Sequence, residues 1–379
     1  MVALNGRNGR NGRNGRNGRN GRNGRGDLDD VFHAGGVTDL AMSTALMTTM
    51  EGISAPWEET GPRPSLTTSP DPVSTTSFQA LERMEPFFRN NVIDNALDRL
   101  FAPLAFARRL QLRSAPDEVA LATAVLPDLQ EDLEQLLAGQ MRFVKAYASL
   151  RDERLEEIVL QQTDTLSFFG ALTFLDDFRT PWTLALLDAV LRFATYVEMP
   201  IKHFVDAPRP VQFSPHVQPV IPTPTHGTLP SGHALEAFAV ATILHALTTE
   251  HGAPYDARAA FADDLHLLMR LATRIAVNRT VAGLHFPVDN FAGATMGIAI
   301  GEYIVNALTG QPTTGQYTVE AASFRDEDFR IDDTTFLDAE PGSCSKILRR
   351  PVAITANAAH RDLREIWRRA RIECAANVV

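Results

Sequence analysis

Residues 228–248, TLPSGHALEAFAVATILHALT, lead from a proline-containing loop into an apolar helical pattern. Apolar side chains recur at three- and four-residue steps, which place them on one face of an α-helix. The turn Pro230-Ser231-Gly232-His233 stands where this helix is predicted to begin. Free N–H groups at a helix start attract anions, and a glycine lets a ligand approach the backbone closely. The Ser231 hydroxyl is suited either to donate to an anion or to cap the helix.

A block of similar character follows this helix and consists of Arg279, His285 and Asp289. Arginine offers a two-pronged donor to an oxyanion. The four-residue step from His285 to Asp289 allows the carboxylate to bond one ring nitrogen. The other nitrogen is then unprotonated and aimed, as a nucleophile or a metal ligand requires.

A third block, Lys202 with Arg209-Pro210, precedes the helix. A seven-residue separation is two helical turns, so both cationic groups are expected to reach one face. Pro208 and Pro210 restrict the backbone on either side of the arginine. Taken together, the three blocks predict one site in which three cations, a hydroxyl and a glycine amide bind an oxyanion between two histidines.

The set resembles the signature of the type-2 phosphatidic acid phosphatase and vanadium haloperoxidase superfamily: Lys-x6-Arg-Pro, Pro-Ser-Gly-His and Ser-Arg-x5-His-x3-Asp. The resemblance covers residues 202–289. Asn278 stands where the family usually has serine, and a small effect is expected because this position is not a main anion ligand. The resemblance implies a helix-bundle fold and a role for each residue of the motif.

In the roles that the resemblance implies, five residues bind the equatorial oxygens of the anion: Lys202, Arg209, Ser231, Gly232 and Arg279. His285 bonds the central atom, as the axial vanadium ligand of a haloperoxidase or as the phosphohistidine nucleophile of a phosphatase. His233 is the general acid-base on the opposite face, and Asp289 orients His285. The implied cofactor is vanadate, and phosphate is suited to the same site. Vanadium would act as a Lewis acid that activates hydrogen peroxide for halide oxidation.

Both activities of this superfamily stay open on the motifs alone. His226 lies seven residues before His233, as in bromoperoxidase-like members, so it is a candidate catalytic residue, although a surface loop histidine is the simpler interpretation. Against this, the gap of 46 residues from His233 to Arg279 is short for the large haloperoxidases and similar to that of the acid phosphatases. Met199 stands where several haloperoxidases have tryptophan. We favour a vanadate-dependent haloperoxidase that uses bromide or iodide. A soluble acid phosphatase is the alternative, and a non-catalytic phosphate-binding protein is a third class.

Charge excludes some partners of this 379-residue chain, whose net charge is −10. Seven arginines and no acids fall in residues 5–25, so the remainder carries −17. An acidic body disfavours nucleic acid, whose phosphates need a basic surface. The expected reaction partners are hydrogen peroxide and halide, or a phosphate ester.

The predicted organisation is a mainly α protein with three parts. Residues 1–26 are a low-complexity tail of Asn-Gly-Arg triplets, and residues 27–75 form an irregular arm rich in Gly, Pro, Ser and Thr. Residues 76–379 are expected to form one all-helical catalytic domain with its motifs in residues 196–308. Strand patterns are scarce, so residues 310–350 are expected to be loops with at most one short hairpin.

Individual helices are predicted from periodicity, caps and prolines. A long amphipathic helix begins after Leu126-Pro127-Asp128, and others are expected at about 154–172, 180–197, 231–248, 256–278, 287–308 and 357–373. Thr180 is the expected N-cap before Pro181. Pro200 is expected to bend the chain before Lys202.

The apolar run Phe291–Leu308 contains Glu302 and three glycines, so it is interpreted as a buried helix and no membrane span is expected. No secretory signal is recognised, which predicts a cytoplasmic or otherwise soluble protein. The two cysteines, Cys344 and Cys374, are too few for a disulfide framework. Relatives of this kind are commonly dimers or larger, so a homo-oligomer is expected.

Overall fold

The computed structural model describes residues 81–82, 86–106, 109–114, 119–127, 130–249, 254–262, 267–331, 336–338, 347–355 and 361–377. The predicted Asn-Gly-Arg tail, the predicted arm and Cys344 lie outside the described residues. Cys374 is a free thiol buried in the fold.

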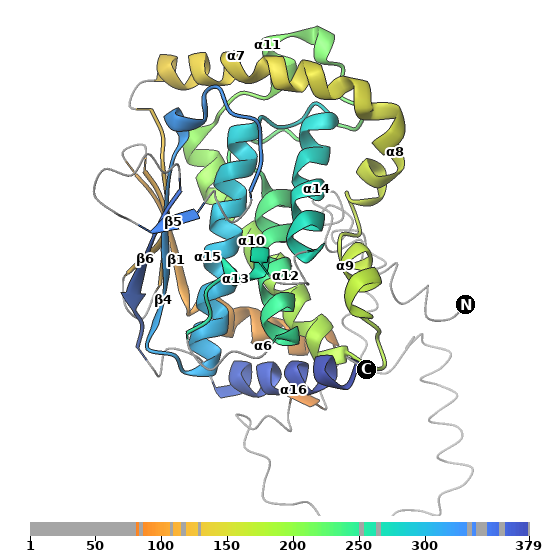
Figure 1. Ribbon diagram of the computed structural model, residues 1–379, viewed down its shortest axis with the longest axis vertical. Coiled ribbons are helices and arrows are strands. Elements are labelled where there is room, and N and C mark those ends of the chain that lie inside the picture. The colour runs from red at the N-terminus through yellow and green to blue at the C-terminus, as the bar shows by residue number, and fades with distance from the viewer. Residues whose placement is uncertain are drawn as a thin grey trace, which may run out of the picture.

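The described chain is a helical bundle with a sheet along one side (Figure 1). The α-helices are α6 (Pro86–Asp98), α7 (Gln130–Tyr147), α8 (Arg151–Leu160), α9 (Leu166–Thr173), α10 (Pro181–Val205), α11 (Pro210–Phe213), α12 (Gly232–Thr248), α13 (Ala259–Ala262), α14 (Leu267–Val281), α15 (Pro287–Thr309) and α16 (Arg361–Asn377). Short 3-10 helices are η1 (Ala148–Leu150), η2 (Pro215–Val217) and η4 (Ala321–Phe324). In Figure 1, α7 crosses one end of the bundle and α16 crosses the other.

Helices α12 and α15 form the centre of the bundle and approach each other closely. A Cβ atom at Gly293 would overlap the carbonyl oxygen of Ser231, and one at Gly297 would overlap that of Leu235. Only glycine permits backbones to approach this closely. This contact fixes the start of α12, and therefore the Pro-Ser-Gly-His turn, against the first turns of α15.

Helix α15 is buried along nearly its whole length. Among the described residues it is the helix that is long and apolar enough to cross a membrane, but its apolar stretch is fully buried inside the protein. The interpretation of residues 291–308 as a buried bundle helix is confirmed.

The prediction of an all-helical domain is wrong, because six strands in the described part of the chain form a mixed sheet. They are β1 (Phe101–Phe106), β2 (Arg109–Ser114), β3 (Ala120–Val125), β4 (Thr313–Glu320), β5 (Phe336–Asp338) and β6 (Ile347–Ala353), in the order β1-β2-β3-β4-β6-β5. Strand β3 pairs in parallel with β4, almost 200 residues later in the chain. Residues 310–350 therefore contribute strands where loops were expected. The alanine-rich β3 segment carries no strong strand preference of its own, so its pairing depends on tertiary contacts.

Several predicted helices have different limits. The expected helix at 154–172 is two helices, α8 and α9, and Asp164 caps the second by accepting the Ser167 amide at 2.9 Å. The expected helix at 256–278 is α13 and α14. Helix α10 does not end near Val197 but continues through Pro200 to Val205. An internal proline removes one backbone hydrogen bond, and the packed surroundings of α10 tolerate that loss.

The start of α10 at Pro181 agrees with the prediction, but its cap is different. The Thr180 side chain makes no cap hydrogen bond and bonds the backbone of Asp176 instead. The Glu373 carboxylate from α16 accepts the amides of Trp182 and Thr183 at 3.0 and 2.8 Å. A residue almost 200 positions away therefore satisfies the free N–H groups of this helix.

A buried ionic cluster joins α15 to the sheet. Glu302 is fully buried and accepts hydrogen bonds from the Arg349 guanidinium at 2.8 Å and the Tyr317 hydroxyl at 2.5 Å. It also accepts the Gly315 and Ala257 amides at 2.5 and 2.9 Å. These four donors compensate for removing the carboxylate from water.

We expect Glu302→Ala to lower the free energy of unfolding by about 3–5 kcal/mol, because it removes the fully buried carboxylate that Arg349 and Tyr317 both bond, and leaves Arg349 with the more distant Asp256 carboxylate at 3.4 Å. Urea unfolding would measure this. Asp326→Ala, which breaks an exposed surface pair with Arg142, is the control and should cost less than about 1 kcal/mol. Equal losses in the two variants would contradict the prediction.

Candidate anion-binding active site

The first motif block lies partly in α10 and partly after its end. Lys202 lies in the last turn of this helix, whereas Arg209 precedes α11 in an extended conformation. The seven-residue spacing predicted that the two residues share one face of a helix. This prediction is wrong, because the helix ends at Val205. The turn at Asp206, with its φ of 44°, redirects the chain so that both cations still reach the same region.

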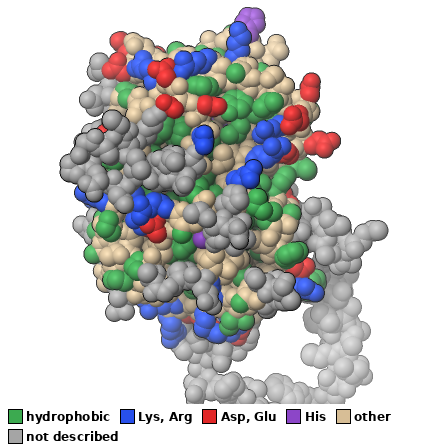
Figure 2. All heavy atoms as spheres, in the orientation of Figure 1, with side chains coloured by type: hydrophobic (Ala, Val, Ile, Leu, Met, Phe, Trp, Pro, Cys, Tyr) green, Lys and Arg blue, Asp and Glu red, His purple; other side chains and the backbone are tan. Residues whose placement is uncertain are grey.

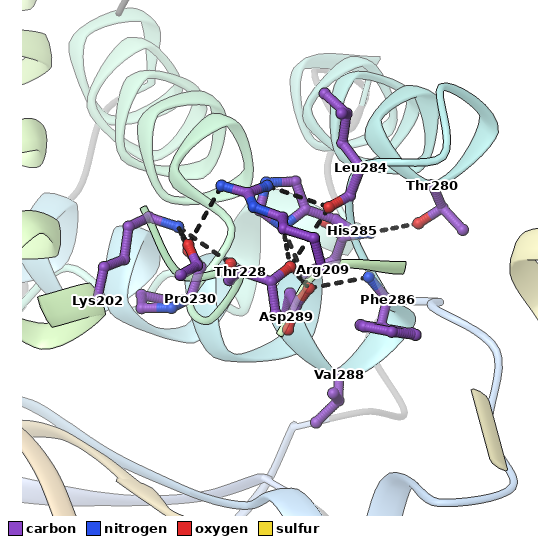
Figure 3. Close-up of polar contacts among 12 residues, drawn as sticks. Lys202, Arg209, Thr228, Pro230, Thr280, Leu284, His285, Phe286, Val288 and Asp289 are labelled. Carbon is purple, nitrogen blue, oxygen red and sulfur yellow. Dashed lines mark hydrogen bonds and ion pairs between the residues drawn. The ribbon is translucent and has the colours of Figure 1, made fainter. Parts of the chain in front are cut away.

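Lys202 is fully buried and is held by the loop of the second block (Figure 3). Its ammonium group donates to the carbonyl oxygens of Gly227, Thr228 and Pro230 at 3.2, 3.0 and 2.5 Å. An ammonium group has three N–H donors, and these carbonyls accept all three. In this arrangement Lys202 contributes its charge to the site and shapes the loop.

Arg209 links the first block to the other two. Its guanidinium donates to the carbonyls of His226 and Leu284 at 3.2 and 3.1 Å, and its Nη1 lies 3.1 Å from Nε2 of His285. Arginine only donates, so Nε2 of His285 is the acceptor and carries the lone pair. His285 therefore has an unprotonated Nε2, as a nucleophile or a metal ligand requires, and in this structure its lone pair accepts from the Arg209 guanidinium.

Asp289 holds the other side of the His285 ring. Its Oδ2 lies 3.1 Å from Nδ1 of His285 and accepts the Thr228 hydroxyl at 2.6 Å and the Phe286 amide at 2.9 Å. Since Nε2 is the acceptor, Nδ1 carries the proton and donates to the carboxylate. Burial raises the pKa of Asp289 from 3.8 to about 6, against the opposing effects of these hydrogen bonds and of Lys202 and Arg209.

Ser231 precedes the first residue of α12, Gly232, as predicted. Its side chain makes no cap hydrogen bond, so simple helix capping does not explain it. Its Oγ is buried without a hydrogen-bond partner among the described residues. The Ser231 amide donates to the Asp289 carbonyl at 2.8 Å, which anchors the turn to α15. A buried hydroxyl beside the N–H groups of a helix start is suited to an oxyanion.

Three motif residues from separate parts of the chain line one cavity: His233, Arg279 and His285. Arg279 is fully buried at the end of α14, and its Nη2 donates to the Ile158 carbonyl at 3.2 Å and to Oε1 of Gln161 at 3.0 Å. Nε2 of His233 lies 3.1 Å from the carbonyl oxygen of Gln161. The cavity thus brings together a cation and both histidines of the motif.

His226 is half-buried beside Arg209. Its Nδ1 lies 3.2 Å from Nη2 of the guanidinium and 3.2 Å from the Gly227 carbonyl oxygen. The sequence left open whether this histidine belongs to the site or to the surface. Its contact with Arg209 places it at the edge of the site.

Three residues without a predicted role complete the surroundings. Thr228 donates to Asp289, Gln161 contacts Arg279 and His233, and buried Asn278 donates to Glu157 and Gln161 at 3.0 Å each. Thr228 stands three residues before Ser231, but no sequence pattern marks Gln161. Asn278, which replaces the usual serine, thus connects α14 to α8.

The outer surface has a different electrostatic character from the site. Figure 2 shows lysine and arginine side chains interspersed with acidic ones over the described part of one face. The cations of the site, by contrast, are buried: Lys202 and Arg279 are fully inaccessible and Arg209 is 3% exposed. Buried cations are costly unless compensated, so their concentration here marks a place suited to an anion.

Comparison with known protein families gives an independent result. Residues 182–311 match the PAP2 superfamily. A PAP2 superfamily domain is therefore present, and it contains every motif residue from Lys202 to Asp289. This superfamily includes both phosphatases and haloperoxidases. No curated protein matches the chain. Helices α8 and α9, and with them Gln161, lie outside the matched residues.

The raised pKa of Asp289 predicts a pH-dependent stability. The folded protein binds this proton more tightly than the unfolded chain does, so the Asp289 contribution falls as the pH rises from about 4 to about 6. In Asp289→Asn this contribution is absent, and the stability of the variant relative to the wild type should improve over this window by on the order of 2 to 3 kcal/mol. Urea unfolding at several pH values measures the difference. A difference between the two proteins that does not change with pH would contradict the assignment.

Proposed function

We propose that this protein is a vanadate-dependent haloperoxidase that oxidises bromide or iodide with hydrogen peroxide. The observation that carries the proposal is the contact between His226 and Arg209. This contact supports the proposal because His226, at the offset from His233 that resembles bromoperoxidase-like members, then lies beside a cation of the proposed anion site. A PAP2 superfamily domain supports the coarser statement that the chain is a phosphatase-like or haloperoxidase-like enzyme.

Vanadate fits the residues present. Ser231 Oγ is a buried hydroxyl that has no hydrogen-bond partner in the described part of the chain. His285 presents its Nε2 lone pair to Arg209, and the buried charges of Lys202 and Arg279 favour an anion at this place. His285 would hold vanadium, and Arg209, Ser231, Gly232 and Arg279 would hold the oxygens. When bound, vanadate would supply a Lewis acid that activates hydrogen peroxide.

The protein's own groups would prepare this site for chemistry. Asp289, which also accepts from Thr228, holds His285 in the tautomer whose Nε2 is unprotonated. His233 would give and take protons at the cavity, as a general acid-base. The three cations would balance the charge of the oxyanion, and the arginines would hold it in one orientation. His226 would contribute to halide selection through its contact with Arg209.

A phosphatase with a phosphohistidine intermediate is the second candidate. The lone pair of His285 Nε2 beside Arg209 also suits attack on a phosphate ester. The 46-residue separation of His233 and Arg279 favours this candidate. Vanadate and phosphate are alike in shape and charge, so the same cations serve both. A non-catalytic phosphate-binding protein is disfavoured by the two histidines at the cavity.

The proposal includes a soluble homo-oligomer, a dimer or larger. Burial of α15, the helix whose length and composition would suit a membrane, supports the soluble state. The acidic net charge of −10 supports small anionic partners reached through a local cationic site, rather than nucleic acid.

The purified chain, given orthovanadate, hydrogen peroxide and bromide, should brominate a dione reporter. His285→Ala should lower the rate of bromination at least 100-fold, because the ligand of the central atom is lost. His216→Ala, at an exposed histidine of η2, is the control and should retain activity. Brisk cleavage of p-nitrophenyl phosphate without any vanadate-dependent bromination would reverse the order of the two candidates.

His226→Ala tests the halide assignment. We expect the bromide KM to rise several-fold, because the variant loses the imidazole that contacts Arg209, while phosphate affinity changes less than twofold. Steady-state kinetics and calorimetric titration with phosphate measure the two quantities. If neither changes, His226 is a surface residue without a role in the reaction.

A further inference from the structure

Gln161 occupies a junction between the two sides of the site. It is the residue that follows α8, and it is 1% exposed. Its side-chain Oε1 accepts hydrogen bonds from Nη2 of Arg279 and from Nδ2 of Asn278, both at 3.0 Å. Its backbone carbonyl lies 3.1 Å from Nε2 of His233. One residue therefore touches both the cation and the acid-base candidate of the cavity.

The chemistry of the side chain decides what this contact does to Arg279. A carboxylate 3 Å from a guanidinium neutralises much of its field, whereas an amide oxygen accepts the hydrogen bond without carrying charge. One turn earlier on α8, Glu157 forms an ion pair with Arg274 at 2.6 Å. Helix α14 thus carries two arginines with different partners. Arg274 pairs with a carboxylate and does not line the cavity, whereas Arg279 bonds an amide and does line it.

The backbone contact decides the protonation of His233. A carbonyl oxygen only accepts hydrogen bonds, so Nε2 of His233 carries a proton. In the neutral ring Nδ1 is therefore unprotonated, and it is the nitrogen that takes up and releases a proton. This contact comes from the carboxyl end of α8, whose unsatisfied carbonyl groups favour a donor.

We propose that Gln161 is a positioning residue of the anion site. Its amide holds Arg279 in place while leaving its positive charge undiminished, and its carbonyl fixes His233 with Nε2 protonated. This inference rests on the oxyanion site of the proposed function, but not on the choice between vanadate and phosphate chemistry. It assigns a role in the site to α8, which lies outside the matched PAP2 segment.

Gln161→Glu is the decisive variant, because it conserves shape and adds one negative charge. The new carboxylate would pair with Arg279, so the melting temperature without ligand should stay within a few degrees of the wild type. Affinity for inorganic phosphate, measured by calorimetric titration, should fall roughly ten- to hundredfold. A structural defect would instead lower the melting temperature together with the affinity.

Two further variants separate charge from hydrogen bonding. Gln161→Met keeps the length but removes the acceptor, and it should weaken phosphate binding by less than Gln161→Glu does. Gln135→Glu adds the same charge at an exposed position of α7 and should leave the affinity unchanged. In spectra of 15N-labelled histidine, His233 should show a protonated Nε2 in the wild type.

The proposal is overturned if Gln161→Glu binds phosphate as tightly as the wild type, fails to fold, or binds more tightly than Gln161→Met. A bare Nε2 on His233 would also overturn it. Phosphate binding by the wild type without bromination would defeat the haloperoxidase proposal and leave the role of Gln161 standing. A wild-type protein that binds neither phosphate nor orthovanadate would defeat both.

Discussion

Asp289 is the residue on which the arrangement of the site depends. Its carbonyl accepts the Ser231 amide, and its carboxylate accepts from Thr228, Phe286 and His285. The second and third motif blocks are therefore tied together by one residue in the first turn of α15. Arg209 connects the first motif block to the third, because its guanidinium donates to the Leu284 carbonyl and to His285. The close approach of α12 and α15 at Gly293 makes this set of bonds possible, because a larger residue would separate the two helices.

The second constraint is electrostatic. Three cations of the site are buried, two of them, Lys202 and Arg209, lie close to the Asp289 carboxylate, and much of the hydrogen bonding of the cations goes to backbone carbonyls. A carbonyl satisfies the donors without removing the charge, so the interior keeps a positive field. The amide of Gln161 has the same effect on Arg279. In the proposed function, neutral acceptors around the cations and the carboxylate bonded to His285 would favour an oxyanion, because the charged groups are already oriented.

Much of the candidate site could be predicted from the sequence, because it is built from short motifs with fixed internal spacing. Ser231 and Gly232 stand at a helix start, and His285 and Asp289 are bonded, as their positions indicated. The sheet, the break between α8 and α9, and the end of α10 could not be predicted. Strand β3 gains its partner from residues almost 200 positions away, and Glu302 finds Arg349 in the same manner. Such contacts leave no periodic pattern in either segment.

The sequence by itself determined the chemical type of the site: two histidines, three cations and a Pro-Ser-Gly-His turn in an order that resembles one superfamily. It determined this because motif residues are close in the chain and their chemistry is set by residue type. Only the tertiary structure decided which groups meet. In the folded chain His226 contacts Arg209, and the ammonium group of Lys202 donates to three backbone carbonyls. Gln161, which follows α8, contacts both Arg279 and His233. These contacts join residues far apart in sequence, and packing of α8, α12, α14 and α15 is what brings them within hydrogen-bonding distance.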